Sequence, residues 1–267
     1  MFLRTFVIAA AATAGFAVST HAAEPPQAPI LAAIARLDSA AVRRILEKDP
    51  GQATVRDARG LSPVTRALFA IRGDAFIEPK QNEMVTALLA RAPTLDFFET
   101  CALGTAAQVE EMLKANPSLA TSWHPFGWTP LHFAGFAGNV AAMDVLLAHG
   151  AGVNERARNR FRNQPLAAAL LTGQLDAAKR LIERGADVNS RQSGGAAPIH
   201  EAALLGRRDL IDLLLDNGAE IGARANDGRN AVSEAERGKH AQVAAYLRTR
   251  GATDPGITAN LSAEPTD

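Results

Sequence analysis

The chain repeats one pattern at a nearly constant interval, and this periodicity constrains its fold more than any other feature. The segments WTPLHFAGFAGN from Trp128, NQPLAAALLTGQ from Asn163 and AAPIHEAALLGR from Ala196 align without gaps. Their prolines at 130, 165 and 198 are 35 and 33 residues apart, and each is followed by a glycine after 20 residues. The same frame gives seven units, which start near 29, 63, 97, 130, 165, 198 and 231. Such a period indicates a stack of small structural units.

Each unit reads as a pair of short helices. In the unit that starts near 130, Thr129 is a favourable N-cap, and Pro130 suits the first helical position, where a backbone N–H would lack a partner. A second helix follows Gly138 with apolar residues at spacings of three and four, and Gly150 suits the left-handed conformation that ends it. One such pair is too small to bury its apolar face, so its neighbours must complete the core.

The motif TPLH at 129–132 and the phrases HGAGVN and RGADVN that close two units resemble the ankyrin repeat. The resemblance runs from about Pro29 to Ala252, and we assign residues 27–252 to the repeat domain. It implies an all-α ankyrin-repeat solenoid of about seven helix-turn-helix units with hairpin fingers. It also implies a protein–protein interaction module, because partners of this family usually contact the finger tips and the exposed ends of the first helices.

Two units depart from the pattern. In the third unit LDFF replaces TPLH. In the second, the insert AIRGDAFIEPKQN moves the second helix nine residues along, to about Met84–Leu89, and leaves a short connection to the next unit. We therefore expect no normal finger at the end of the second unit, and no continuous groove through the second and third units.

The first 22 residues have the composition of a secretory signal peptide. A basic start at Arg4 precedes an apolar run, and Thr20 and Ala22 are the small residues that a signal peptidase reads. A membrane anchor is the alternative, although the run is short and rich in alanine. The alanine-rich signal and the single cysteine, which excludes an intramolecular disulfide, are the basis for expecting an exported protein of a bacterial periplasm. The neutral net charge gives no indication of nucleic acid or an anionic membrane as a partner. We expect the polar tail at 253–267 to be disordered.

Catalytic and metal-binding signatures are missing from the sequence. It has no G-x-S-x-G elbow, no phosphate-binding glycine loop and no His or Cys cluster with metal spacing. His132 and His200 recur at one position of the repeat, two units apart, and are expected to form structural hydrogen bonds. Cys101 is expected to be a small buried residue, with a redox-active thiol as the alternative. We therefore predict no catalytic residue, no metal site, no cofactor and no enzyme activity.

Aromatic residues gather in the turn before the fourth unit. Against the family pattern D-x-x-G-x-T-P-L-H, Phe126, Trp128 and, further along the helix, Phe136 fall on positions that the fold leaves free. Exposing such side chains to water costs about 1.5–3 kcal/mol each. We therefore predict that a protein partner covers these three residues. His124, which replaces the usual Asp, suggests the alternative of a small-ligand or catalytic site on the concave face.

The next finger is rich in arginine, and it supplies the other predicted contacts. Four arginines alternate with other residues, and in an extended strand a period of two would place them on one side: Arg156, Arg158, Arg160 and Arg162. Arg160, Phe161 and Asn163 occupy free positions there. Later fingers continue the basic edge with Arg191, Arg224 and Arg229. We predict binding to an anionic patch of a partner through Arg160, Phe161, Asn163 and Arg229, or, alternatively, a soluble loop with Phe161 turned inward.

One apolar position near the end of each first helix forms a row along the stack. Its members are Phe69, Leu103, Phe136, Leu171 and Leu204. Packing between units is one explanation, and a groove for an extended apolar peptide is the other. The preferred function is a non-catalytic binding module that takes a protein partner, with no nucleic acid and no stable membrane insertion after signal cleavage. An inhibitor or immunity-type protein would use the same surface.

Overall fold

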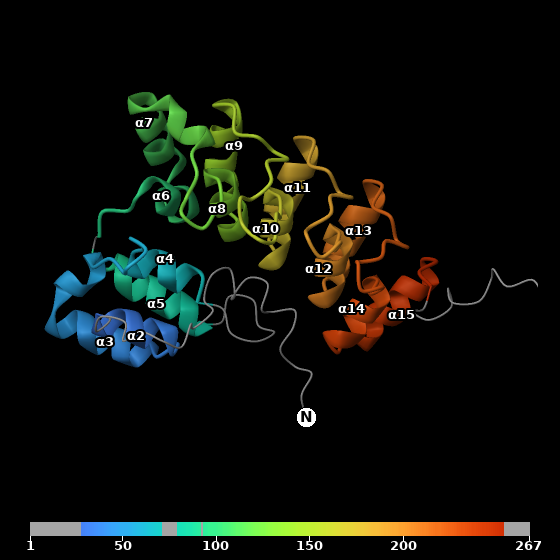
Figure 1. Cartoon of the computed structure of the whole chain (residues 1–267), viewed down its shortest axis with the longest axis horizontal. Helices are drawn as coiled ribbons and strands as arrows, with labels where there is room; N and C mark the ends of the chain where they lie inside the picture. The colour runs from blue at the N-terminus through green and yellow to red at the C-terminus, as the bar shows by residue number, and fades with distance from the viewer. Residues whose placement is uncertain (1–27, 71–78, 92, 254–267) are drawn as a thin grey trace, which may run out of the picture.

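The computed structural model describes residues 28–70, 79–91 and 93–253, and within them the chain is entirely helical. These ranges contain fourteen α-helices, two short 3-10 helices and no strand (Figure 1). The expected all-α solenoid of seven helix pairs is confirmed. The proposed signal peptide and residues 254–267 of the predicted tail lie outside the described residues.

Every first helix begins at the position that the repeat frame assigns to it. The first helices are α2 (Pro29–Ala35), α4 (Pro63–Leu68), α6 (Phe97–Leu103), α8 (Pro130–Ala137), α10 (Pro165–Leu171), α12 (Pro198–Leu204) and α14 (Ala231–Arg237). The second helices are α3 (Ser39–Lys48), α5 (Pro79–Leu89), α7 (Ala106–Ala115), α9 (Val140–Ala148), α11 (Leu175–Glu183), α13 (Arg208–Asp216) and α15 (Ala241–Thr249). The 3-10 helices η1 (Pro50–Thr54) and η2 (Pro117–Thr121) follow α3 and α7.

Local signals set these boundaries. Thr129 is the N-cap of α8, but its hydroxyl bonds to Nδ1 of His132 at 2.7 Å rather than to a backbone N–H. Gly138 ends α8 with a φ of 74°, in the left-handed region that favours glycine. Gly150 follows the C-cap residue of α9 with a φ of 83°. The glycines therefore end these helices as the motif predicts, whereas the Thr129 side chain binds the motif histidine instead of capping the helix.

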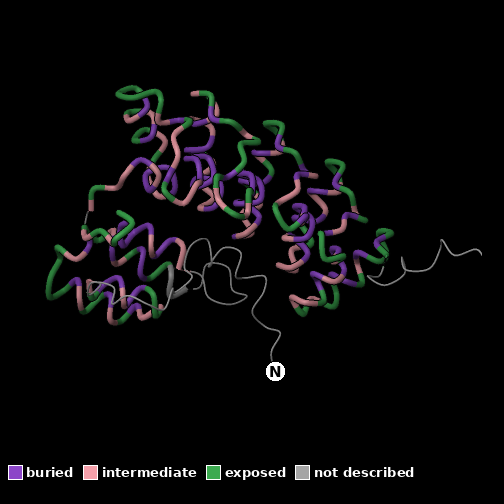
Figure 2. The backbone as a smooth tube through the Cα atoms, viewed as in Figure 1, coloured by how far each residue is buried: buried purple, intermediate pink, exposed green. Residues whose placement is uncertain are grey.

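Units 3–7 stack in order and share one core. Their first helices form the inner row of an arch, and α7, α9, α11 and α13 form the outer row (Figure 1). Buried residues concentrate on the inner row, and the turns are mostly exposed (Figure 2). A single hydrophobic cluster extends from Phe97 to Ala252. Because each unit lends apolar surface to the next, this cluster requires all five units.

Units 1 and 2 depart from this order and pack onto the inner face of the arch. Phe69 of unit 2 and Phe136 of unit 4 occupy equivalent positions two units apart, yet their ring centroids are 4.9 Å apart. Neighbouring helices alone are about 8–10 Å apart, so a regular stack would separate these rings by roughly 20 Å. Unit 2 therefore reaches past unit 3 to unit 4. Only residues 90–96 separate α5 from α6, which agrees with the expected absence of a normal finger.

A polar contact joins units 2 and 3 near the starts of α4 and α6. Glu99 stands at the position of the motif histidine in unit 3 and is buried. One of its oxygens accepts hydrogen bonds from the hydroxyls of Ser62 and Thr65, and the other accepts from the backbone N–H of Asp96. A carboxylate at this position thus links two helix starts that do not stack.

Phe69 lies among four aromatic rings of unit 4, and this set of five is called the aromatic joint below. Its ring centroid is 5.2 Å from those of Phe126, Trp128 and Phe133, with near-perpendicular planes, as aromatic pairs prefer. Trp128 is 7% exposed and Phe136 is 3% exposed. The prediction that a protein partner covers these two side chains was therefore wrong, because unit 2 of the same chain covers them.

We predict that Phe69→Ala opens the aromatic joint. The substitution should lower the free energy of unfolding by about 2–4 kcal/mol, from lost burial and ring contacts. It should also shift tryptophan emission to longer wavelength, because Trp128 gains contact with water. Thermal denaturation and emission spectra measure both effects.

Leu204→Ala is the matched control for this variant, because Leu204 has the same place in unit 6, away from the aromatic joint. Its emission should match that of the unsubstituted protein. Unchanged emission for Phe69→Ala would mean that units 1 and 2 do not cover Trp128 in solution.

Candidate functional site

A pocket of about 640 Å³ lies where three turns meet. The turns precede α4, α8 and α10, so they are far apart in sequence and are brought together by the placement of unit 2 on unit 4. The lining residues are Arg59, Leu61, Trp123, His124, Pro125, Phe126, Gly127, Arg158, Asn159 and Arg160. None of the ten is acidic. This three-turn pocket opens to solvent, since Arg59, Pro125, Arg158 and Arg160 are exposed.

Backbone hydrogen bonds fix the walls of the three-turn pocket. The N–H of His124 donates to the carbonyl of Trp128 at 2.8 Å, which closes the turn before α8. The N–H of Arg158 donates to the carbonyl of Gly127 at 2.7 Å and joins the next turn to it. Gly127 has a φ of 75°, and a Cβ there would lie 2.7 Å from the backbone carbon of Arg158. Only glycine permits this close approach of the two turns.

His124 forms a neutral, hydrogen-bonding part of the pocket wall. Its Nδ1 accepts from the N–H of Phe126 at 3.2 Å, which places the ring proton on Nε2. Its ring packs against Phe98, Phe126 and Phe133 with centroid separations of 4.7–5.0 Å. Burial lowers the pKa of His124 to about 4. At neutral pH the ring is therefore an uncharged donor to a ligand.

Two arginines bring positive charge to the pocket. The guanidinium carbon of Arg158 lies 3.9 Å from the ring centroid of Trp123, and that of Arg160 lies 4.7 Å from the ring centroid of Phe161. Such cation–π contacts orient the flat guanidinium group. Neither group has a carboxylate partner in the described part of the chain. Phe161 is half-buried, so the predicted pair of Arg160 and Phe161 is present at the surface.

The expected strand with four arginines on one side was wrong. Residues 157–163 form a turn, in which Arg162 has a φ of 53°. Arg156 leaves this surface and donates to the carbonyl of Arg191 at 2.6 Å. Two extra residues in this finger account for the turn, because Ala157 and Asn163 close it where His124 and Trp128 close the previous one.

Asn163 was predicted to contact a partner, but it is 3% exposed and holds neighbouring units together. Its side-chain oxygen accepts from Nε1 of Trp128 at 3.2 Å, and its carbonyl contacts Nε2 of His132 at 3.1 Å. The motif histidine therefore links its own helix start to the next finger. The contacts of His132 with Thr129 and Asn163 confirm its expected structural hydrogen bonds, and burial lowers its pKa to about 4.

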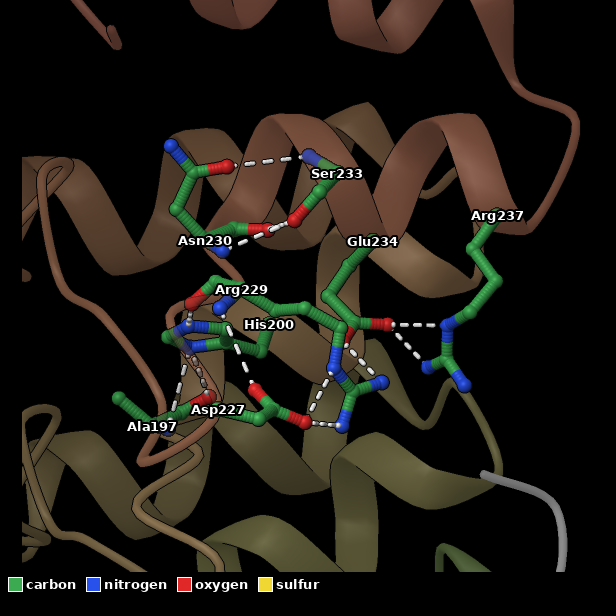
Figure 3. Close-up of polar contacts among 8 residues, drawn as sticks. All are labelled: Ala197, His200, Asp227, Arg229, Asn230, Ser233, Glu234 and Arg237. Carbon is green, nitrogen blue, oxygen red and sulfur yellow. Dashed lines mark hydrogen bonds and ion pairs between the residues drawn. The ribbon is translucent and has the colours of Figure 1, made fainter. Parts of the chain in front are cut away.

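Arg229 is a second correction, since ion pairs within the chain occupy its side chain. Its Nη2 lies 2.6 Å from Asp227 and its Nη1 lies 2.9 Å from Glu234 (Figure 3). Arg237 also pairs with Glu234, and Nε2 of His200 contacts the carbonyl of Arg229 at 3.3 Å. The basic edge therefore loses its charge at this end of the stack.

Sequence reasoning also missed a ladder of arginines between fingers. Arg156 donates to the carbonyl of Arg191, and Arg191 donates to the carbonyl of Arg224, both at 2.6 Å. Arg191 and Arg224 also each donate to a carbonyl four residues ahead in their own turn, at 3.1 Å. In both turns the arginine stands four residues before a glycine, Gly195 or Gly228. This spacing is visible in the sequence and is the signal that could have identified the ladder.

The other chemical groups give no sign of catalysis. Cys101 is fully buried, and burial raises the pKa of its thiol, as expected for a structural cysteine. Residues 28–70, 79–91 and 93–253 contain no cluster of three His, Cys, Asp or Glu side chains suited to a metal ion. No helix in this part of the chain has both the length and the apolar character needed to cross a membrane.

Residues nine positions apart meet repeatedly beside the first helices. Arg66 pairs with Asp57, the ring of Phe133 lies 4.8 Å from that of His124, and Gln192 donates to Glu201. These pairs occupy the same two places in units 2, 4 and 6. Glu201 differs in that its second oxygen is buried and has no hydrogen-bond partner among the described residues. Burial and the nearby charge of Glu234 raise its pKa to about 8.

We predict that Glu201→Gln stabilises the protein increasingly as the pH rises. The folded-state pKa of about 8 lies above the ordinary value of 4.5. Unfolded chains therefore lose this proton first, and Glu201 lowers stability progressively between these two pH values. The gain from the substitution should be near zero at pH 4 and on the order of 1–3 kcal/mol at pH 8. Thermal melts across this range measure it.

Glu111→Gln, on the exposed face of α7, is the control and should follow the unsubstituted protein at each pH. A constant gain for Glu201→Gln from pH 4 to pH 8 would contradict a raised pKa.

Family models identify two stretches of the chain. The model "Ankyrin repeats (3 copies)" matches residues 80–192, and "Ankyrin repeat" matches residues 194–226. Together they cover more than half of the chain, and they include the turns before α8 and α10. They do not include α2, α3 or α4. Arg59, which precedes α4, lines the pocket, and Phe69, which follows α4, belongs to the aromatic joint.

Curated relatives share the repeats over part of their length. Protein phosphatase 1 regulatory subunit 27 of Mus musculus is 29% identical over 102 residues, which are 38% of this chain and 65% of that protein. The Arf-GAP with coiled-coil, ANK repeat and PH domain-containing protein 2 of Homo sapiens is 37% identical over 70 residues, or 26% of this chain and 9% of that one.

A third relative is the transient receptor potential cation channel subfamily A member 1 homolog of Caenorhabditis elegans, 31% identical over 87 residues, which are 33% of this chain and 7% of the channel. The chain thus spans less than a tenth of the length of the channel and of the Arf-GAP. The repeat frame, the helix pairs and both model matches agree that the chain belongs to the ankyrin repeat family.

Proposed function

We propose that this chain is a non-catalytic protein-binding module that takes an anionic partner at the turns before α8 and α10. The observation that carries the proposal is the pair of solvent-exposed guanidinium groups, Arg158 and Arg160, each held against an aromatic ring and without a carboxylate partner in the described residues. Arginine beside aromatic side chains is enriched among residues that dominate binding energy. Membership of a repeat family and the regulatory name of one relative support an interaction role.

The contact surface differs from the seven residues that the sequence suggested. Phe126, Arg160 and Phe161 remain in the proposed contact surface. Trp123 and Arg158 are added, because both line the three-turn pocket and the guanidinium of Arg158 lies over the ring of Trp123. Trp128 and Phe136 support this surface from below through the aromatic joint. Asn163 and Arg229 hold the repeats together and are removed from the proposed contact.

Export is a further part of the proposal. It rests on the signal-like composition of residues 1–22 and on a single, buried cysteine. We place the working protein in the periplasm, with the repeat domain at 27–252. Intact-mass analysis of the protein recovered from the periplasmic fraction tests this assignment. A chain that retains its first 22 residues would contradict it.

The binding test begins with the exported form of the chain immobilised as bait for its host's periplasmic proteins. We expect selective capture of a protein with an acidic surface. Arg160→Ala combined with Phe161→Ala should then weaken its binding by about 1–3 kcal/mol, because both lie at the exposed turn. Calorimetric titration of the purified partner measures the change.

Lys179→Ala, exposed on the outer helix α11, is the control and should bind as the unsubstituted protein does. Equal affinity for the double variant would move the contact elsewhere, to another surface of the stack. A role as an inhibitor or immunity-type protein would appear as loss of the captured partner's activity.

The second candidate is a small-ligand protein, and the three-turn pocket beside His124 favours it. A volume of 640 Å³ lies within the range of about 300–1,000 Å³ that is usual for small-molecule sites. Melting temperatures that rise with a metabolite in the absence of any protein partner would support this candidate.

A further inference from the structure

The three-turn pocket has a wall that a regular stack of repeats would not supply. Turns before α8 and α10 belong to neighbouring units, but Arg59 and Leu61 come from unit 2. Leu61 is 2% exposed, and the nearby aromatic joint holds unit 2 in place through Phe69. The pocket is therefore complete only while unit 2 rests on unit 4.

The charge of the pocket is positive. Arg59, Arg158 and Arg160 line it, and no acidic side chain does. Of the carboxylates in the adjoining turns, Asp57 pairs with Arg66 and Asp96 lies 3.7 Å from Arg56. Glu155 lines a smaller neighbouring pocket with Trp123 and Arg158, but it does not line this one. His124 adds no charge, because its pKa is lowered to about 4. An anion is the complementary ligand for such a site.

The apolar part of the pocket has flat surfaces. Trp123 and Phe126 present aromatic rings, and the guanidinium of Arg158 lies over the ring of Trp123. A planar guanidinium stacked on a ring keeps its N–H groups directed outward along its own plane, where they can bind a carboxylate in bidentate fashion. The neutral imidazole of His124 supplies one further N–H donor. This combination suits a carboxylate that is attached to an aromatic ring.

We propose that the three-turn pocket binds an aromatic carboxylate. Arg158 and Arg160 take the carboxylate, and Trp123 and Phe126 pack against the ring. The ligand is either a free aromatic acid or the carboxylate of a partner peptide that ends in an aromatic residue, and for the peptide the inference rests on the proposed function. A ligand in the pocket also lies against the wall that unit 2 supplies through Arg59 and Leu61, so occupancy and closure of the aromatic joint stabilise each other.

Calorimetric titration of the full chain with small probes tests the pocket directly. The probes are benzoate, its uncharged counterpart benzamide and acetate, which lacks the ring. A peptide ending in phenylalanine is compared in free-acid and amidated forms. We expect benzoate to bind and to raise the melting temperature, and benzamide and acetate to bind at least about tenfold more weakly, since each lacks one of the two contacts. Peptide binding that needs the free carboxylate identifies a partner, and benzoate binding alone identifies a small acid.

Variants then locate the site. Arg158→Gln combined with Arg160→Gln should lower benzoate affinity about tenfold or more with little change in melting temperature, and Phe69→Ala should lower it by opening the pocket wall. Arg162→Gln, in the same turn but outside the pocket lining, should leave affinity unchanged. Equal binding of benzamide and benzoate, or benzoate binding that survives loss of both arginines, would overturn the proposal. So would no binding of any probe by the folded protein.

This result is separable from the fate of the proposed function. Failure to capture a protein partner while benzoate binds through Arg158 and Arg160 removes the interaction module and keeps the pocket. Capture through Phe161 without any binding of benzoate or peptide does the reverse.

Discussion

A pair of helices of six to eleven residues cannot bury its own apolar face, and the whole molecule is arranged around this constraint. Units 3–7 meet it in the ordinary way, by lending surface to the next unit along one continuous core. Unit 2 cannot, because its second helix is displaced and only seven residues connect it to unit 3. Its apolar end packs against the aromatic rings of unit 4 instead. A second hydrophobic core forms mainly from units 1, 2 and 4, and Phe69 packs against it. Apolar helix faces are therefore buried in two ways, by stacking of adjacent units and by packing of unit 2 on unit 4.

The sequence was sufficient for the parts of the structure that depend on neighbours in the repeat. Every first helix starts at its frame position, because proline or a residue in its place acts locally, and Ser62, Asp96 and Asn230 add a side-chain cap to three of the seven helices. The roles of His132 and Cys101 also followed from their positions. What the frame lacks is contact between units that are not adjacent. Trp128 and Phe136 occupy positions that the repeat leaves free, but freedom in one unit does not mean exposure when another unit lies over it.

The sequence is also insufficient to predict which arginines of the candidate site keep a charge that a partner can reach. Arginines in three consecutive fingers look alike in sequence, yet the structure separates them by the groups that lie near each one. Arg156 and Arg191 donate hydrogen bonds to carbonyl groups of the next finger, and Arg229 forms ion pairs with Asp227 and Glu234. Arg158 and Arg160 lie against aromatic rings and have no carboxylate partner among the described residues, so their charge is available. This finger has two more residues than the others, and they form a turn in place of an extended strand. The alternation of arginines in the sequence predicts a strand and does not show this turn.

The aromatic joint also decides how the chain tolerates shortening. The terminal units of a repeat stack usually carry a polar outer face that keeps the stack soluble. A chain that begins at unit 3 would additionally uncover Phe126, Trp128, Phe133 and Phe136 on the inside of the arch. Contiguous apolar area of that kind promotes self-association. Units 1 and 2 therefore cover this apolar area, and we expect a chain without them to self-associate rather than remain a smaller monomer.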